Sequence, residues 1–297
     1  MARPVDVIHG PQDDSDRRTR ARGVRPNAWP LVPVLGFLAI AALGWWPGLD
    51  PTGQDLTERL QPPVGWGGSW QHPAGTDSLG RDLFARVATG AQLSLAIGLA
   101  VALCAAGIGV VLGLWAGIAG GVADDLITSL SEVILSIPTI VVGLVVVATL
   151  GQGLMNLIAL LVMTAWITQA RVLRLQARRV MQSDFVAASL AQGAGQKHLA
   201  TRHVAPNVLP QIVVVLCQQV AAVMIWESSL TYLGLGLPIE QISLGGLIRD
   251  GQQHLFDAPW LGIIPGVVLA GAIISFSVLA GWIQARLEPG GVPPGRS

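Results

Sequence analysis

The longest apolar run in the sequence has no charged residue from Val87 to Ala123. An α-helix needs only about 20 apolar residues to cross the hydrocarbon core of a bilayer, so this run is long enough for a membrane span. We expect one helix of about 27 residues followed by a glycine-rich exit. Over the whole chain 12% of the residues are charged, whereas soluble domains have about 25%. The sequence therefore predicts an all-α, polytopic membrane protein.

Further uncharged segments bring the expected number of transmembrane helices to six. The first covers residues 28–46. A cleaved signal peptide is the alternative there, but the segment ends in Trp45-Trp46-Pro47 and not in the small residues of a cleavage site. Asp124 and Asp125 are expected to form a water-facing turn before the third span. The last four spans are expected at Leu126–Leu150, Leu154–Leu173, Pro210–Leu233 and Trp260–Ile283.

Polar segments divide the chain around these spans. Residues 1–27 are a mostly polar tail with no core, and we expect this tail to be disordered. Residues 47–90 are rich in Gly, Pro and Trp and are expected outside the membrane. Residues 91–286 then form the core transmembrane domain, which includes a polar loop at 174–209. Residues 287–297 are a short tail.

The basic residues are divided unequally between the two sides of the expected membrane. Fourteen of the eighteen Lys and Arg residues fall on the side of the N-terminus, and Arg59, Arg81, Arg86 and Arg249 fall on the other. Cytoplasmic segments are enriched in Lys and Arg. We therefore expect both termini and the 174–209 loop in the cytoplasm.

Four glycines follow one another at intervals of four residues in the second span. They are Gly109, Gly113, Gly117 and Gly121. This spacing places them along one face of a helix. In lipid, helices associate through close backbone packing, which small residues allow. We expect this face to pack against another helix; a glycine-rich helix without a special partner is the alternative.

Glu132 and Glu227 are the ionisable residues nearest to the hydrocarbon. Ionisable residues within spans are functional candidates. Each, however, lies about two helical turns from a predicted membrane face. A carboxylate at the interface, or one that caps a turn, is the alternative interpretation of both.

No catalytic, metal-binding or cofactor-binding arrangement is evident. The only lysine, Lys197, lacks the preceding glycine of a phosphate-binding loop, and the five histidines have no ligand spacing. Cys104 and Cys217 lie in apolar runs and are expected to be small buried side chains. The net charge is zero, which gives no reason to expect a nucleic acid partner. We expect no enzyme activity and no metal.

The 174–209 loop contains a short helical pattern. Asp184 is expected to cap a helix from Phe185 to Gln192, which Gly193 ends. So short a helix is unstable alone in water. Its residues Phe185, Ala188 and Ala191 share one face, which we expect to dock on a partner. Pro206 and Pro210 are expected to end any helix before the fifth span.

Four segments resemble a known family. In the loop, Asp184-Phe185-Val186-Ala187-Ala188-Ser189 is followed by Gly193-Ala194 and Pro206-Asn207-Val208-Leu209-Pro210. The others are His72-Pro73-Ala74-Gly75-Thr76-Asp77-Ser78-Leu79-Gly80-Arg81-Asp82, Leu230-Thr231-Tyr232-Leu233-Gly234-Leu235-Gly236, and Ala258-Pro259-Trp260 with Pro265-Gly266. Together they resemble the permeases of ATP-binding-cassette (ABC) importers, in the dipeptide, oligopeptide and nickel branch.

The resemblance implies a type I ABC importer permease fold in a bacterial cytoplasmic membrane. It also implies a second permease, two ATPase subunits that bind the ATP, and an extracytoplasmic binding protein. This chain would then need no cofactor, and its cargo would be a di- or oligopeptide or, alternatively, nickel or a metal chelate. The residues expected to couple it to the ATPases are Asp184, Phe185, Ala187, Ala188, Gly193, Ala194, Pro206, Leu209 and Pro210.

The loop departs from the family's pattern at two positions. Ala187 stands where the family has a glutamate, and Leu190 stands where it has an arginine. The resemblance then implies that a polar contact, either with the ATPase or within the loop, is missing or rebuilt, and Arg178, Arg179 and Lys197 are candidates to replace it.

Two functions of other classes remain as alternatives. A self-sufficient secondary carrier usually has an internal repeat with broken helices, and no such repeat is evident. A membrane-embedded enzyme would need converging catalytic groups, and none is evident in the spans.

Overall fold

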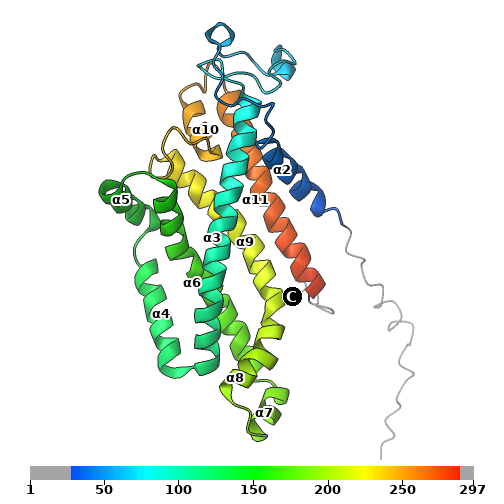
Figure 1. Cartoon of the computed structure of the whole chain (residues 1–297), viewed down its shortest axis with the longest axis vertical. Helices are drawn as coiled ribbons and strands as arrows, with labels where there is room; N and C mark the ends of the chain where they lie inside the picture. Colours follow the sequence, from blue (N-terminus) through cyan, green and yellow to red (C-terminus); the bar gives the residue numbers. More distant parts are fainter. Residues whose placement is uncertain (1–27, 288–297) are drawn as a thin grey trace, which may run out of the picture.

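The computed structural model describes residues 28–287 (Figure 1). The tail predicted at residues 1–27 lies outside the described residues, as does the tail predicted at 287–297 except for Leu287. The described part is all-helical, as predicted, and its only β-type pairing is an isolated bridge between Thr76 and Asp82.

Four long helices form the body of the molecule. Each is long and apolar enough to cross a membrane. They are α3 (Leu83–Ala119), α6 (Leu154–Met181), α9 (Ala205–Tyr232) and α11 (Trp260–Leu287). The long helix α3 contacts both α6 and α9, and α11 packs along α9 (Figure 1). The buried apolar core lies between these helices.

The first predicted span is shorter than expected. Helix α2 (Leu31–Leu43) has 13 residues and ends at Gly44, before the two tryptophans. At 1.5 Å per residue it is about 20 Å long, whereas the hydrocarbon core is about 30 Å thick. It lies against α3 and α11. Within residues 28–287 four helices are thus long and apolar enough to span a membrane, or five if the next pair of helices counts as one, and the predicted number of six is not confirmed.

The predicted third span is broken. Helices α4 (Gly121–Leu135) and α5 (Thr139–Leu150) are bent by 73° with respect to each other. Pro138 occupies the N-cap of α5 and lacks the N–H that would continue α4, and it disfavours helical backbone at Ile137. The segment predicted as one continuous span over 126–150 is therefore two helices, which form a broken span or a re-entrant loop.

The turn between α3 and α4 also differs from the prediction. The chain reverses at Gly120 and Gly121, whose φ angles are +62° and +52°. Positive φ is accessible to glycine at little cost. Helix α3 ends only at this reversal and has 37 residues, whereas about 27 were expected. It also starts within the segment predicted outside the membrane, because the Asp82 side chain accepts a hydrogen bond from the Ala85 N–H and caps it.

At one end of the body, called the α7 end here, the predicted 174–209 loop is mostly helical. Helix α6 continues to Met181 and is followed by α7 (Asp184–Ala191), α8 (Gln196–His198) and the π-helical segment η3 (Leu199–Val204). These run directly into α9. Pro206 lies in the first turn of α9 and Pro210 lies inside it. The expectation that these prolines end the helix was wrong: Pro206 lies where a missing N–H is tolerated, and α9 continues through Pro210 although one internal hydrogen bond is lost there.

The opposite end, called the α10 end here, bears the short helices η1 (Leu56–Glu58) and η2 (Val64–Trp66) and the longer α10 (Leu244–Gln252). The Ser243 side chain caps α10 by accepting a hydrogen bond from the Gly246 N–H. Helix α10 packs on α11, α9 and α3 (Figure 1). The segment 234–257, which lies between the predicted fifth and sixth spans, therefore contains a packed helix.

Candidate functional sites

Helix α7 stands at the α7 end with one side attached and one side free. Val186 is fully buried, and the helix contacts α6 and η3. On the other side Phe185 is 49% exposed, and Ala188 and Ala191 are exposed as well. The Phe185 ring lies 5.7 Å from the ring of His203 in η3. The apolar face expected for docking is thus open to solvent.

The ends of α7 are set by local backbone chemistry. Ser183 occupies the N-cap and Asp184 is the first helical residue, so the expectation that Asp184 is the cap was wrong by one position. At the other end Gly193 has a φ of +85° and donates to the Leu190 carbonyl, while the Ala194 N–H donates to Ser189. This pair of bonds is a Schellman motif, which requires a left-handed residue.

The positions that depart from the family's pattern, Ala187 and Leu190, are exposed on α7. Of the three basic residues considered as replacements, Arg178 is ion-paired with Asp124 of α4. Arg179 and Lys197 are exposed.

Three of the residues predicted to couple the chain to the ATPases lie on the first turns of α9 and not on α7. Pro206 and Leu209 are exposed there, and Pro210 is partly buried.

The glycines of α3 lie against α6. A Cβ atom built at Gly113 would be 2.6 Å from the Ala170 carbonyl oxygen, and one at Gly117 would be 2.6 Å from the Ala177 Cβ. A Cβ at Gly109 would collide with Gln169 in the same way. No side chain larger than hydrogen fits at these three positions without movement of α6. Gly121 does not belong to this face, because it is the first residue of α4 and no atom of another described residue lies within 4 Å of its Cβ position.

An ion-pair cluster joins α4 to α6 near the α7 end. Asp124 is buried and pairs with Arg174 and Arg178. Arg174 also donates to the Thr128 hydroxyl at 2.6 Å. The expectation of a water-facing turn at Asp124 was therefore wrong, although Asp125 is exposed.

Glu227 and Glu132 have different environments. Glu132 is exposed on α4. Glu227 on α9 is 0% exposed, and its carboxyl group accepts hydrogen bonds from the hydroxyls of Ser94 at 3.0 Å, Ser228 at 3.1 Å and Thr231 at 3.3 Å. Ser94 belongs to α3, so this network joins two of the long helices close to the start of α10.

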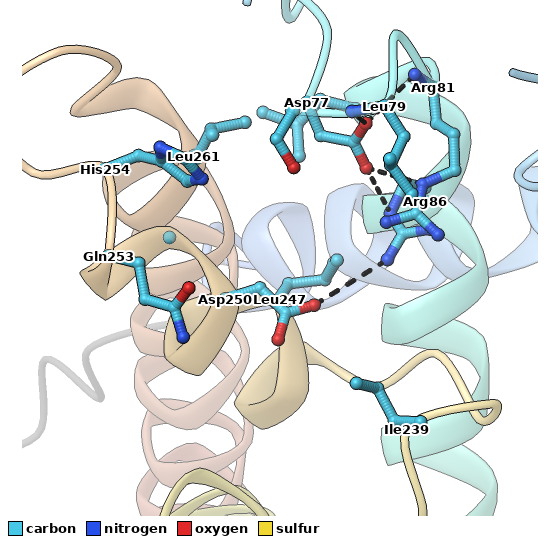
Figure 2. Close-up of a pocket in the computed structure, with 13 residues that line it drawn as sticks. Asp77, Leu79, Arg81, Arg86, Ile239, Leu247, Asp250, Gln253, His254 and Leu261 are labelled. Atoms are coloured by element: carbon cyan, nitrogen blue, oxygen red, sulfur yellow. Dashed lines mark hydrogen bonds and ion pairs between the residues drawn. The ribbon is translucent and has the colours of Figure 1, made fainter.

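A polar pocket of about 290 Å³ opens at the α10 end (Figure 2). Asp77 pairs with Arg81 at 2.7 Å and with Arg86 at 3.5 Å, and Arg86 reaches Asp250 of α10 at 4.0 Å. These contacts link the 47–82 segment to α3 and α10. The sequence contained a signal for this pocket, because Asp77 and Arg81 lie in a segment that resembles the family.

His72 stabilises the 47–82 segment from within. Its ring nitrogens lie 2.7 Å from the carboxylates of Asp82 and Glu58. Burial disfavours the imidazolium, but the hydrogen bonds with Asp82 and Glu58 outweigh it, and the pKa of His72 is raised above its ordinary value. Because Asp82 also caps α3, His72 connects this segment to the start of a long helix.

Metal-binding residues are not gathered in the part of the chain from 28 to 287. No group of three or more His, Cys, Asp and Glu side chains there is placed to hold an ion. The cysteines are separate, with Cys217 buried and Cys104 exposed, so the expectation that both are buried was wrong for Cys104.

Comparison with known proteins gives one family and several relatives. Residues 109–290 match the family model described as the binding-protein-dependent transport system inner membrane component. The chain is 32% identical to the probable D,D-dipeptide transport system permease protein DdpC of Escherichia coli, over 87% of this chain and 85% of the relative. It is 30% identical to the nickel transport system permease protein NikC of the same species, over 86% and 91%. It is 32% identical to the oligopeptide transport system permease protein OppC of Bacillus subtilis, over 74% and 72%.

Proposed function

The chain belongs to the family of binding-protein-dependent transport system inner membrane components, and on that premise we propose that its cargo is a di- or oligopeptide. It is a permease subunit of an ABC importer for peptides or nickel. Two of the three relatives described above are named for peptides and one for nickel, so nickel is the second candidate.

The proposal assigns α7 as the docking site for an ATPase subunit. The observation on which it rests is an eight-residue helix outside the long-helix body whose apolar face is exposed. An exposed Phe185 on so short an element favours burial against a partner, since a buried aromatic side chain is stabilised by a few kcal/mol. The two ATPases bind the ATP, and movement between them is transmitted to the spans through α7.

The proposed orientation places the α7 end in the cytoplasm together with both termini. The exposed Arg171, Arg179, Lys197 and Arg202 lie in the segments at that end. An excess of Lys and Arg favours the cytoplasmic side. The α10 end then faces the binding protein outside, and a second permease completes the path for the cargo.

Purification of the tagged, full-length chain from its native membrane tests the docking role. We expect it to retain a second permease and ATP-binding subunits. Phe185→Glu places a charge on the α7 face and should release the ATPases while the second permease stays bound. Phe256→Glu is the matched control, because Phe256 is fully exposed near the α10 end. Retention of the ATPases by the Phe185→Glu variant would overturn the assignment of α7.

A further inference from the structure

A cavity about half way along α6 and α9 lies apart from the sites above. Its volume is about 260 Å³, and it is bounded by the end of α4, the start of α5 and the facing sides of α6 and α9. The lining includes apolar residues and an indole, that of Trp226, and it includes no charged residue. Its polar groups are the hydroxyls of Thr139, Thr164 and Thr168 and the amides of Gln218 and Gln219.

Several of these polar groups have no partner within residues 28–287. Gln219 is 8% exposed, yet its amide makes no hydrogen bond to a described residue. The same holds for Gln218 and Thr168, which are exposed along helices that are apolar enough to cross a membrane. An amide or hydroxyl in hydrocarbon without a hydrogen bond costs several kcal/mol. These groups therefore need water, a neighbouring subunit or a bound molecule at this depth.

The broken third span ends in the same cavity. Leu135 at the end of α4 and Thr139 at the start of α5 both line it. The first turn of α5 has no capping side chain, and within residues 28–287 only its third and fourth N–H groups, those of Val141 and Val142, are bonded, both to the Pro138 carbonyl, so the N–H groups of Thr139 and Ile140 remain open to an acceptor. Irregular backbone at membrane depth occurs where it is buried in protein or lines a water-filled cavity. The helix break and the unpartnered Gln219 amide are two independent indications of a ligand here.

We propose that this cavity is one half of the path through the membrane and that Gln218 and Gln219 bind the backbone peptide groups of the cargo. This inference rests on the proposed function, and it names the chemistry of cargo that the path accepts. A glutamine amide offers two N–H donors and a carbonyl acceptor, which match the carbonyl and N–H of a peptide bond. Nickel would instead need imidazole, thiolate or carboxylate ligands, and the lining has none.

The size of the cavity agrees with a binding site that is shared between two permease subunits. Cavities that enclose small ligands are typically about 300 to 1,000 Å³. This cavity lies just below that range, and the exposure of Thr168 and Gln218 leaves one side open. A second permease that covers this side would complete the enclosure.

The test uses the whole complex in proteoliposomes, with the binding protein and ATP, and two probes: ¹⁴C-labelled alanyl-alanine and ⁶³Ni²⁺. Gln218→Leu and Gln219→Leu remove the amides at similar volume. We expect each to lower alanyl-alanine uptake about tenfold, the effect of losing one or two hydrogen bonds. ATP hydrolysis stimulated by the binding protein should stay within about twofold of the parent, because α7 is unchanged.

Gln169→Leu is the matched control. Gln169 is a fully buried glutamine of α6 that does not line the cavity, and neither its amide oxygen nor its amide nitrogen has a partner in the described part of the chain. Its replacement should leave uptake within about twofold of the parent. Equal losses in all three variants would indicate a general effect of losing a polar side chain and would overturn the assignment.

The outcomes separate this inference from the proposed function. If the parent complex takes up alanyl-alanine and the Gln218 and Gln219 variants do so equally well, the cavity assignment is wrong and the peptide importer stands. If the parent takes up ⁶³Ni²⁺ and no peptide, the peptide cargo and the peptide-binding role of the cavity both fail. If it takes up neither probe under ATP hydrolysis, the proposed cargo class fails.

Discussion

The Ser94 hydroxyl on α3 donates a hydrogen bond of 3.0 Å to the buried carboxyl group of Glu227 on α9. The two residues lie 133 positions apart in the chain, so the bond joins helices that meet only through folding. Among residues 28–287 the side chains that donate to the Glu227 carboxyl are hydroxyls, those of Ser94, Ser228 and Thr231, and none is basic. The network therefore depends on an oxygen acceptor at this position more than on a charge.

Glu227→Gln should consequently be tolerated, because the amide keeps an oxygen that accepts from Ser94. We expect it to lower the free energy of unfolding by less than about 1 kcal/mol. Glu227→Ala removes the acceptor and leaves a cavity, and we expect a loss of about 3 kcal/mol. The apparent melting temperature of the purified complex measures both. A Gln variant as unstable as the Ala variant would indicate that the charge itself is needed.

The glycine contacts of α3 predict a difference between two substitutions in one helix. Gly113→Leu places a side chain where even a Cβ would meet the Ala170 backbone, so α6 must move. We expect a loss of about 3 kcal/mol in stability, at the upper end of overpacking effects. Gly107→Leu is the control, because nothing lies within 4 Å of its Cβ position. Equal melting temperatures for the two variants would contradict the tight packing of this face.

The left-handed backbone at Gly193 predicts a defect in coupling. Gly193→Val at a φ of +85° should distort the end of α7, so that ATP hydrolysis continues while uptake falls by about tenfold or more. Gly195→Val is the control, since Gly195 has extended backbone with a φ of −78° and open space around it. Uptake and ATP hydrolysis are measured on the same proteoliposomes. Normal uptake by the Gly193→Val variant at normal expression would exclude a role for this turn.

The buried Asp124 predicts that α4 loosens from α6 when its charge is removed. Asp124→Asn leaves Arg174 and Arg178 without their counter-charge. We expect a loss of about 2 kcal/mol, below the usual value for a buried pair because both arginines are partly exposed to solvent. The exposed neighbour Asp125→Asn is the control and should change stability by less than about 0.5 kcal/mol. Apparent melting temperatures decide between these outcomes.

The environment of His72 predicts a pH dependence at the α10 end. The folded segment raises the pKa of His72 above the ordinary value of 6.5, so the protonated form is favoured by folding. Its contribution to stability is fully present below pH 6.5 and is lost as the pH rises through the raised pKa. Limited proteolysis within residues 47–82 should therefore become faster over that interval. His72→Gln should remove this dependence, and an unchanged pH profile in the variant would show that another group is responsible.

The sequence predicted the helical class, the family and the α7 segment because each depends on local information. Hydropathy identified the long helices, and Gly193 and the pattern around Phe185 marked a short helix without reference to the rest of the fold. Pro138 lies inside the predicted third span, where a kink is expected, but the bend of 73° that divides the span into two helices was not predicted, because neighbouring helices decide whether such a proline kinks a helix or ends it.

Contacts between distant residues were the hardest to predict. Asp124 was expected to face water, since nothing near it in sequence shows that Arg174 and Arg178 pack against it 50 and 54 residues later. Likewise, the burial of Glu227 depends on Ser94 and on α10, and the cavity lined by Gln219 depends on the bend between α4 and α5. By contrast, the four-residue spacing of the glycines indicated which face of α3 packs closely against another helix. That this other helix is α6 could be seen only in the structure.

The continuity of the helix from Gln196 to Tyr232 has a mechanical consequence. Its 37 residues form a rod about 55 Å long at 1.5 Å per residue. One end begins beside α7, and the other holds Glu227 and Thr231 next to the start of α10. A tilt of about 5° at the α7 end would displace the far end by about 5 Å. A small rotation imposed at α7 would thus displace the opposite end of this helix by more than the length of a hydrogen bond. The π-helical turn at Leu199–Val204 is the place where the helix can bend to allow this rotation.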